Sequence, residues 1–78
     1  MVFEKVADIL SSQFGIDLDQ ITADTDIIGD LGADSLDIVE LMMSLENEFA
    51  LLITDEMTAD VRTVGEVVKV IENLLDKQ

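Results

Sequence analysis

The chain has 78 residues, no Cys, no His and a formal net charge of −14. A chain of this length forms one domain, which we expect to span residues 1–78. Without Cys it has no disulfide and no thiolate metal site, and without His it has neither a Ser-His-Asp triad nor an imidazole zinc ligand. We therefore predict neither an enzyme nor a metal site, although 49% hydrophobic residues are ample for a folded core.

The negative charge is concentrated in the middle of the chain. The four basic residues are Lys5, Arg62, Lys69 and Lys77, whereas 14 of the 18 acidic residues lie between residues 6 and 61. This charge repels nucleic acid, because binding to phosphates requires cationic side chains. One interpretation is a solubilising, self-repelling surface, which also favours a monomer. The other is that partner proteins present basic patches and are steered to this domain electrostatically.

No apolar run is long enough to cross a membrane, and the N-terminus lacks the basic and apolar stretches of a signal peptide. We expect no stable membrane insertion and a cytoplasmic location.

Apolar residues at helical spacing predict a first helix over Val2–Phe14, which Gly15 ends. A long connection rich in Asp, Thr and Gly follows to Ala33. A structureless loop of this length is unusual in a small domain, so we expect its apolar residues to pack back over the core. These residues are Ile16, Leu18, Ile21, Ile27, Ile28 and Leu31.

Asp34 is the expected N-cap of a second helix that runs to about Phe49, and Asp37 adds favourable negative charge to its first turn. A short third helix is predicted near Asp55–Asp60, capped by Thr54. The fourth helix begins at a Thr63/Glu66 capping box and reaches about Leu75. Its predicted core face consists of Val64, Val67, Val68, Ile71, Leu74 and Leu75. The fold class is therefore all-α, a small four-helix bundle with a long first connection and a short third helix.

The second helix carries two apolar stripes. On a helical wheel with Ile38 at zero, a core stripe of Leu41, Met42, Leu45 and Phe49 falls within about 60°. A second stripe of Leu36, Val39 and Met43 falls roughly 100–160° away.

The second stripe has two interpretations. It packs under the long connection, or it is an exposed apolar strip with an acidic rim that binds partners transiently. Methionine suits a partner surface because its flexible thioether adapts to several shapes.

Three other functional motifs are incomplete in this sequence. The segment Asp24–Gly29 begins like a calcium-binding EF-hand loop but has Ile28 at the fifth position and Ser35 at the twelfth. Ser35 does not lie in a Gly-x-Ser-x-Gly nucleophile elbow and has no His as a base. A carboxylate-pair hydrolase lacks an aromatic-lined cleft, because the only aromatic residues are three Phe.

The segment Asp30–Leu41, with Gly32-Ala33-Asp34-Ser35-Leu36 at its centre, closely resembles the signature of the acyl carrier proteins of type II fatty-acid synthesis. The resemblance extends over essentially the whole chain in length, acidity and helix order. It departs from the common pattern at Ala50, Leu52, Thr54 and Met57, which make the region around the third helix more apolar.

The resemblance implies that Ser35 bears 4'-phosphopantetheine, transferred from coenzyme A by a holo-acyl-carrier-protein synthase, with acyl chains held as thioesters on its thiol. The start of a helix suits an attached phosphate because of its free amides and dipole. The implied partners are ketoacyl synthases, reductases, a dehydratase and acyltransferases, which bind through basic patches. The implied partner-binding residues are Asp34, Leu36, Asp37, Val39, Glu40, Met43, Glu46 and Glu48.

The resemblance also implies that the interior of the bundle shelters the acyl chain, near Leu45, Phe49, Ile53 and Ile71. Two alternatives stay open at this stage. The first is a carrier of the same fold that serves another acyl-transfer pathway, such as polyketide synthesis. The second is an acidic adaptor domain that uses the second-helix strip, with Ser35 unmodified or phosphorylated.

Overall fold

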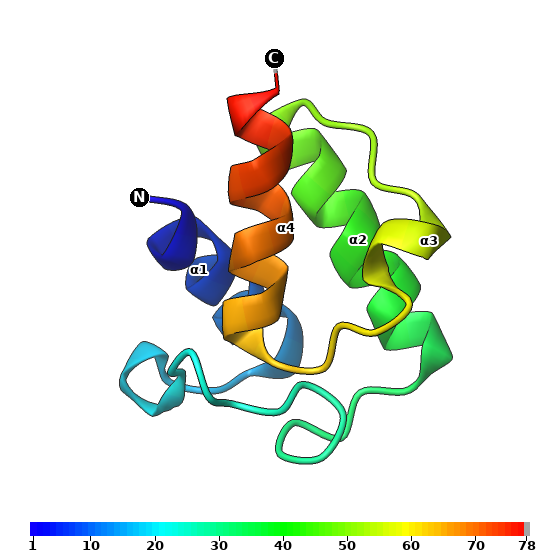
Figure 1. Cartoon of the computed structure of the whole chain (residues 1–78). Helices are drawn as coiled ribbons and strands as arrows, with labels where there is room; N and C mark the ends of the chain where they lie inside the picture. Colours follow the sequence, from blue (N-terminus) through cyan, green and yellow to red (C-terminus); the bar gives the residue numbers. More distant parts are fainter. Residues whose placement is uncertain (78) are drawn as a thin grey trace.

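A computed structural model describes residues 1–77 as a bundle of helices (Figure 1). The elements are α1 (Val2–Phe14), the short 3₁₀ helix η1 (Leu18–Gln20), α2 (Ser35–Phe49), α3 (Asp55–Thr58) and α4 (Val64–Asp76). Within residues 1–77 the only β pairing is an isolated bridge between Asp26 and Thr63. The all-α class, the long first connection and the short third helix are confirmed. Within the same range, no helix is both long and apolar enough to cross a membrane.

The helix ends follow local side-chain chemistry. Gly15 ends α1 with φ 67, a left-handed conformation that glycine adopts without steric cost. Thr63 and Glu66 form the expected capping box at the start of α4. The third helix ends two residues earlier than expected, because the amide of Val61 donates to the carbonyl of Thr58 at 3.1 Å and closes a tighter turn there.

The core lies where α1 packs against α2 and α4, with the long connection covering one end of the bundle (Figure 1). The largest fully buried side chains come from all three long helices and from the connection: Val6, Leu10, Ile27, Leu41, Leu45, Val64 and Ile71. The predicted core faces of α2 and α4 are confirmed, since their remaining apolar members pack against this cluster.

The long connection packs back over the core, as predicted, through four of its six apolar residues. Ile21 and Ile27 are buried, and Ile16 and Leu31 are half-buried. The expectation is wrong for Leu18 and Ile28, which are 49% and 44% exposed. Ile28 lies in a turn that the Asp26 side chain shapes by accepting the Ile28 and Gly29 amides, and this turn faces the Ile28 side chain outward.

Backbone hydrogen bonds join this connection to the start of α4. The amide of Ile27 donates to the Arg62 carbonyl at 2.8 Å, and the amide of Val64 donates to the Thr25 carbonyl at 3.0 Å. These bonds satisfy polar groups that the packing removes from water. They hold residues 25–27 of the connection against the chain that leads into α4.

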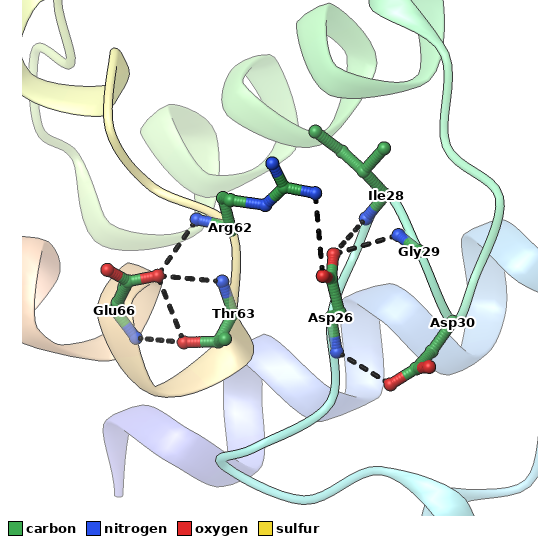
Figure 2. Close-up of polar contacts among 7 residues, drawn as sticks. All are labelled: Asp26, Ile28, Gly29, Asp30, Arg62, Thr63 and Glu66. Carbon is green, nitrogen blue, oxygen red and sulfur yellow. Dashed lines mark hydrogen bonds and ion pairs between the residues drawn. The ribbon is translucent and has the colours of Figure 1, made fainter.

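Two carboxylates reinforce this junction (Figure 2). The Asp26 carboxylate accepts the Gly29 amide at 2.8 Å and lies 3.6 Å from the Arg62 guanidinium. These contacts, the Gly29 amide first, hold the pKa of Asp26 below its ordinary value. Glu66 accepts the Arg62 and Thr63 amides, both at 3.0 Å, and these bonds likewise lower the pKa of Glu66.

Candidate attachment site and interaction surface

Ser35 is the first residue of α2, and its side chain is exposed. The helix begins there because Asp34 and Asp37 cap it reciprocally. The Asp37 amide donates to Asp34 Oδ1 at 3.0 Å, and the Asp34 amide donates to Asp37 Oδ2 at 3.2 Å. The N-cap role of Asp34 is confirmed. Sequence reasoning missed the return bond from Asp37, because this position in a capping box is usually Glu or Gln.

The groups that remain free around Ser35 fit a phosphate ester. Within residues 1–77, the Ser35 hydroxyl and the amides of Ser35 and Leu36 make no hydrogen bond. Free amides at a helix start attract a phosphate, and the helix dipole adds to this attraction. The carboxylates of Asp34 and Asp37 lie in the same turn and oppose it. The free amides and these carboxylates would therefore act on a phosphate ester at Ser35 in opposite directions.

Two contacts fix the position of this first turn. Ala33, the second residue before Ser35, is buried, and its amide donates to the Ile27 carbonyl at 3.2 Å. Gln13 Nε2, from α1, donates to the Asp37 carbonyl at 2.8 Å. Gln13 was missed by sequence reasoning, because a contact across 24 positions leaves no local signal. The turn that bears the exposed serine is thus anchored to the long connection and to α1.

The second apolar stripe of α2 is exposed. Leu36, Val39 and Met43 are 66%, 53% and 57% exposed, whereas Leu41 and Leu45 of the core stripe are fully buried. The interpretation that this stripe packs under the connection is therefore wrong. What remains is an apolar strip that starts one residue after Ser35 and continues along the same helix.

The acidic side chains around the strip differ in the hydrogen bonds and ion pairs that they make within the chain. Glu46 is half-buried and accepts the Ile53 amide at 2.9 Å, and Glu48 forms an ion pair with Lys5 at 3.1 Å. Asp34 and Asp37 cap the helix. Among the predicted partner-binding acids, only Glu40 has a side chain that makes no hydrogen bond or ion pair within residues 1–77. Partner binding by these acids stays a prediction.

A small apolar gap lies between α2, α3 and α4. It is lined by Met42, Leu45, Ile53, Thr58, Val67, Val70 and Ile71. The space among these side chains is too narrow for a water molecule. Three of the four residues expected to surround a sheltered chain line this gap, and Phe49 does not.

The comparisons with known proteins agree with this geometry. Residues 4–71 match the family model described as "Phosphopantetheine attachment site", a range that contains Ser35. The chain is 54% identical over 72 residues to a protein named acyl carrier protein from Clostridium acetobutylicum, covering 92% of this chain and 94% of that protein.

Solved structures show the same likeness. A chain assigned as an acyl carrier protein of Mycobacterium tuberculosis superposes with a TM-score of 0.86 at 29% identity, covering 94% of this chain and 97% of that one. A structure of the acyl carrier protein from Enterococcus faecalis gives a TM-score of 0.80 at 41% identity, covering 94% and 92%.

The fold, the capped helix start with its free serine and the match over most of the chain all indicate one family. The chain belongs to the acyl carrier proteins, non-enzymatic proteins that carry acyl chains on a 4'-phosphopantetheine group.

Proposed function

We propose that Ser35 is the residue that bears 4'-phosphopantetheine, and that the protein presents acyl thioesters on this arm to the enzymes of fatty-acid synthesis. The observation that carries the proposal is the exposed, unbonded Ser35 hydroxyl at the capped start of α2. When bound, the group supplies the thiol that holds the acyl chain, and the absence of Cys means that no protein thiol competes for it.

The residues around Ser35 position the hydroxyl and leave the chemistry to the transferase. Attack by Ser35 Oγ on the diphosphate phosphorus of coenzyme A that bears the pantetheine forms the ester bond and breaks the phosphoanhydride bond, releasing adenosine 3',5'-bisphosphate. The hydroxyl proton leaves to a base of the transferase, because this chain has no His and Ser35 is hydrogen-bonded to no carboxylate within residues 1–77.

The strip of Leu36, Val39 and Met43 is proposed as the surface that partner enzymes bind. Its apolar area supplies affinity, and the acidic residues around it steer basic patches toward it. Glu40 is the acid best placed for this role, because its carboxylate is free of intramolecular bonds within the described chain. The proposed partners are the holo-synthase, ketoacyl synthases, reductases, a dehydratase and acyltransferases.

We further propose that the protein works as a monomer in the cytoplasm, where coenzyme A is available. The net charge of −14 supports the monomer, because two copies repel one another.

The attachment site is tested by intact mass. The purified chain is incubated with coenzyme A, magnesium and a broad-range phosphopantetheinyl transferase. We expect a gain of one phosphopantetheine in the wild type and in Ser12→Ala, which removes another exposed serine. Ser35→Ala should gain nothing. Loading of Ser35→Ala, or no loading of the wild type while a control carrier is modified, would refute the assignment.

A further inference from the structure

The segment of residues 50–53, which joins α2 to α3, departs from regular structure at its first residue. Ala50 ends α2 with φ 54 and ψ 45, the only positive φ at a non-glycine residue within residues 1–77. A left-handed conformation costs an alanine roughly 1–2 kcal/mol. Such a conformation persists only where surrounding contacts hold it.

Ile53 and Leu51 pack against the core, and the hydrogen bonds of the segment are all accepted by one residue. The Leu51 amide donates to the Glu46 backbone carbonyl at 3.2 Å, and the Ala50 amide donates to the same carbonyl. The Ile53 amide donates to Glu46 Oε2 at 2.9 Å. Within residues 1–77, these are the hydrogen bonds that the amides of segment 50–53 donate, and Glu46 accepts each of them.

The segment covers the apolar gap between α2, α3 and α4. Ile53 lines this gap and is only 9% exposed, while its neighbour Leu52 is 76% exposed. No residue of α3 is buried, and Thr58 is the one residue of this helix that lines the gap. Because the gap does not admit even a water molecule, an acyl chain enters only if the residues that line it move apart.

We propose that Glu46 is a positioning residue that latches segment 50–53 over the apolar gap and thereby opposes entry of the acyl chain. This inference rests on the proposed function for its cargo, while the latch itself is a property of the unmodified chain. The hydrogen bond from Ile53 to Glu46 is present in the closed form. A variant that lacks the bond loses stability in the closed form only, and the population shifts toward the open form.

The latch is tested first on the unmodified chain by amide hydrogen exchange. Glu46→Ala should lower the protection of the Ile53 amide by roughly tenfold or more, since a hydrogen bond to a charged group is lost. Glu46→Gln, which keeps an acceptor oxygen, should retain most of the protection. Glu72→Ala, which removes an exposed acid of α4, should leave it unchanged. Equal protection in the wild type and Glu46→Ala would overturn the latch.

The effect on the cargo is tested with holo protein loaded with acyl chains of increasing length. Hydroxylamine cleaves an exposed thioester faster than a sheltered one. We expect the cleavage rate to begin to fall at a shorter acyl chain length in Glu46→Ala than in the wild type. At the shortest length that Glu46→Ala shelters, its cleavage rate should be several-fold lower than that of the wild type. Glu72→Ala should match the wild type.

The outcomes separate this inference from the proposed function. An unchanged or reversed length profile in Glu46→Ala would overturn the latch. A rate independent of chain length in every variant would show that the gap shelters no chain, and would overturn it as well. Neither result affects attachment at Ser35, which intact mass measures beforehand.

Discussion

The amide nitrogen of Gly65 lies 2.9 Å from the carbonyl oxygen of Ala23, so the first turn of α4 touches the backbone of the long connection directly. A β-carbon added at Gly65 would lie 3.0 Å from that same oxygen. A side chain at this position would therefore press against the backbone of the connection.

Gly65→Ala should consequently destabilise the protein. In an unobstructed helix this change stabilises by about 1 kcal/mol. Here the added methyl group forces the connection away from α4, and we expect a net loss of about 1–3 kcal/mol. Urea denaturation measures it, with the exposed Asn73→Ala of the same helix as the control. A higher stability of Gly65→Ala than of the wild type would show that the connection moves away from α4 at little cost.

Ala50→Gly should stabilise the folded protein, and Gly15→Ala should destabilise it. Both residues end a helix in the left-handed region, with φ 54 at Ala50 and φ 67 at Gly15. Glycine at position 50 relieves steric strain, and alanine at position 15 introduces it with nothing else within 4 Å of its β-carbon. We expect changes of about 1 kcal/mol each in thermal or urea unfolding. Shifts of the same sign would contradict the strain at Ala50.

Loss of the cap at Thr63 should weaken α4. Its hydroxyl accepts the Glu66 amide at 3.2 Å, so Thr63→Ala leaves that amide without its partner. The expected cost is about 1 kcal/mol in the free energy of unfolding. Thr54→Ala, at the four-residue α3, serves as the comparison and should cost less, because its bond to the Met57 amide is longer at 3.4 Å. The reverse order would argue against this ranking of the two caps.

Asp26→Asn should remove the contribution of the Asp26 charge to the free energy of unfolding. The stability of the variant should therefore depend less on pH than that of the wild type. The contacts of Asp26 lower its pKa in the folded chain, so the charged carboxylate favours folding above the ordinary pKa of the group. The advantage of wild type over Asp26→Asn should be complete at about pH 6 and should decline as the pH falls below about 4. Urea unfolding across this range measures the difference, and Glu66→Gln should behave in the same way. A difference that stays constant with pH would exclude the charge as its source.

Glu40→Lys should slow the association of partner enzymes. The substitution reverses a charge on the exposed side of α2 without breaking an intramolecular bond within the described chain. We expect slower loading of Ser35 by the transferase and a weaker dependence of that rate on salt, since steering is an electrostatic effect on association. The matched charge reversal Glu72→Lys, on α4, should have a smaller effect. Salt dependence equal to that of the wild type would count against steering by Glu40.

The sequence alone predicted the features that depend on neighbours in the chain. Helical periodicity predicts the bounds of α1 and the two stripes of α2. The caps are side chains that bond an amide three residues further on, at Asp34, Thr54 and Thr63. The same local pattern located Ser35 at a helix start. Its role as the attachment point stays a proposal.

The tertiary structure decided which acidic side chains are bound within the chain and which apolar side chains are exposed. Nothing local indicates that Glu46 holds Ile53 or that Glu48 pairs with Lys5, 43 positions away. Nor does periodicity in an irregular connection show that Ile27 is buried while Ile28 is exposed. Such contacts depend on how distant segments meet when the core closes, and that is set by packing of the whole chain.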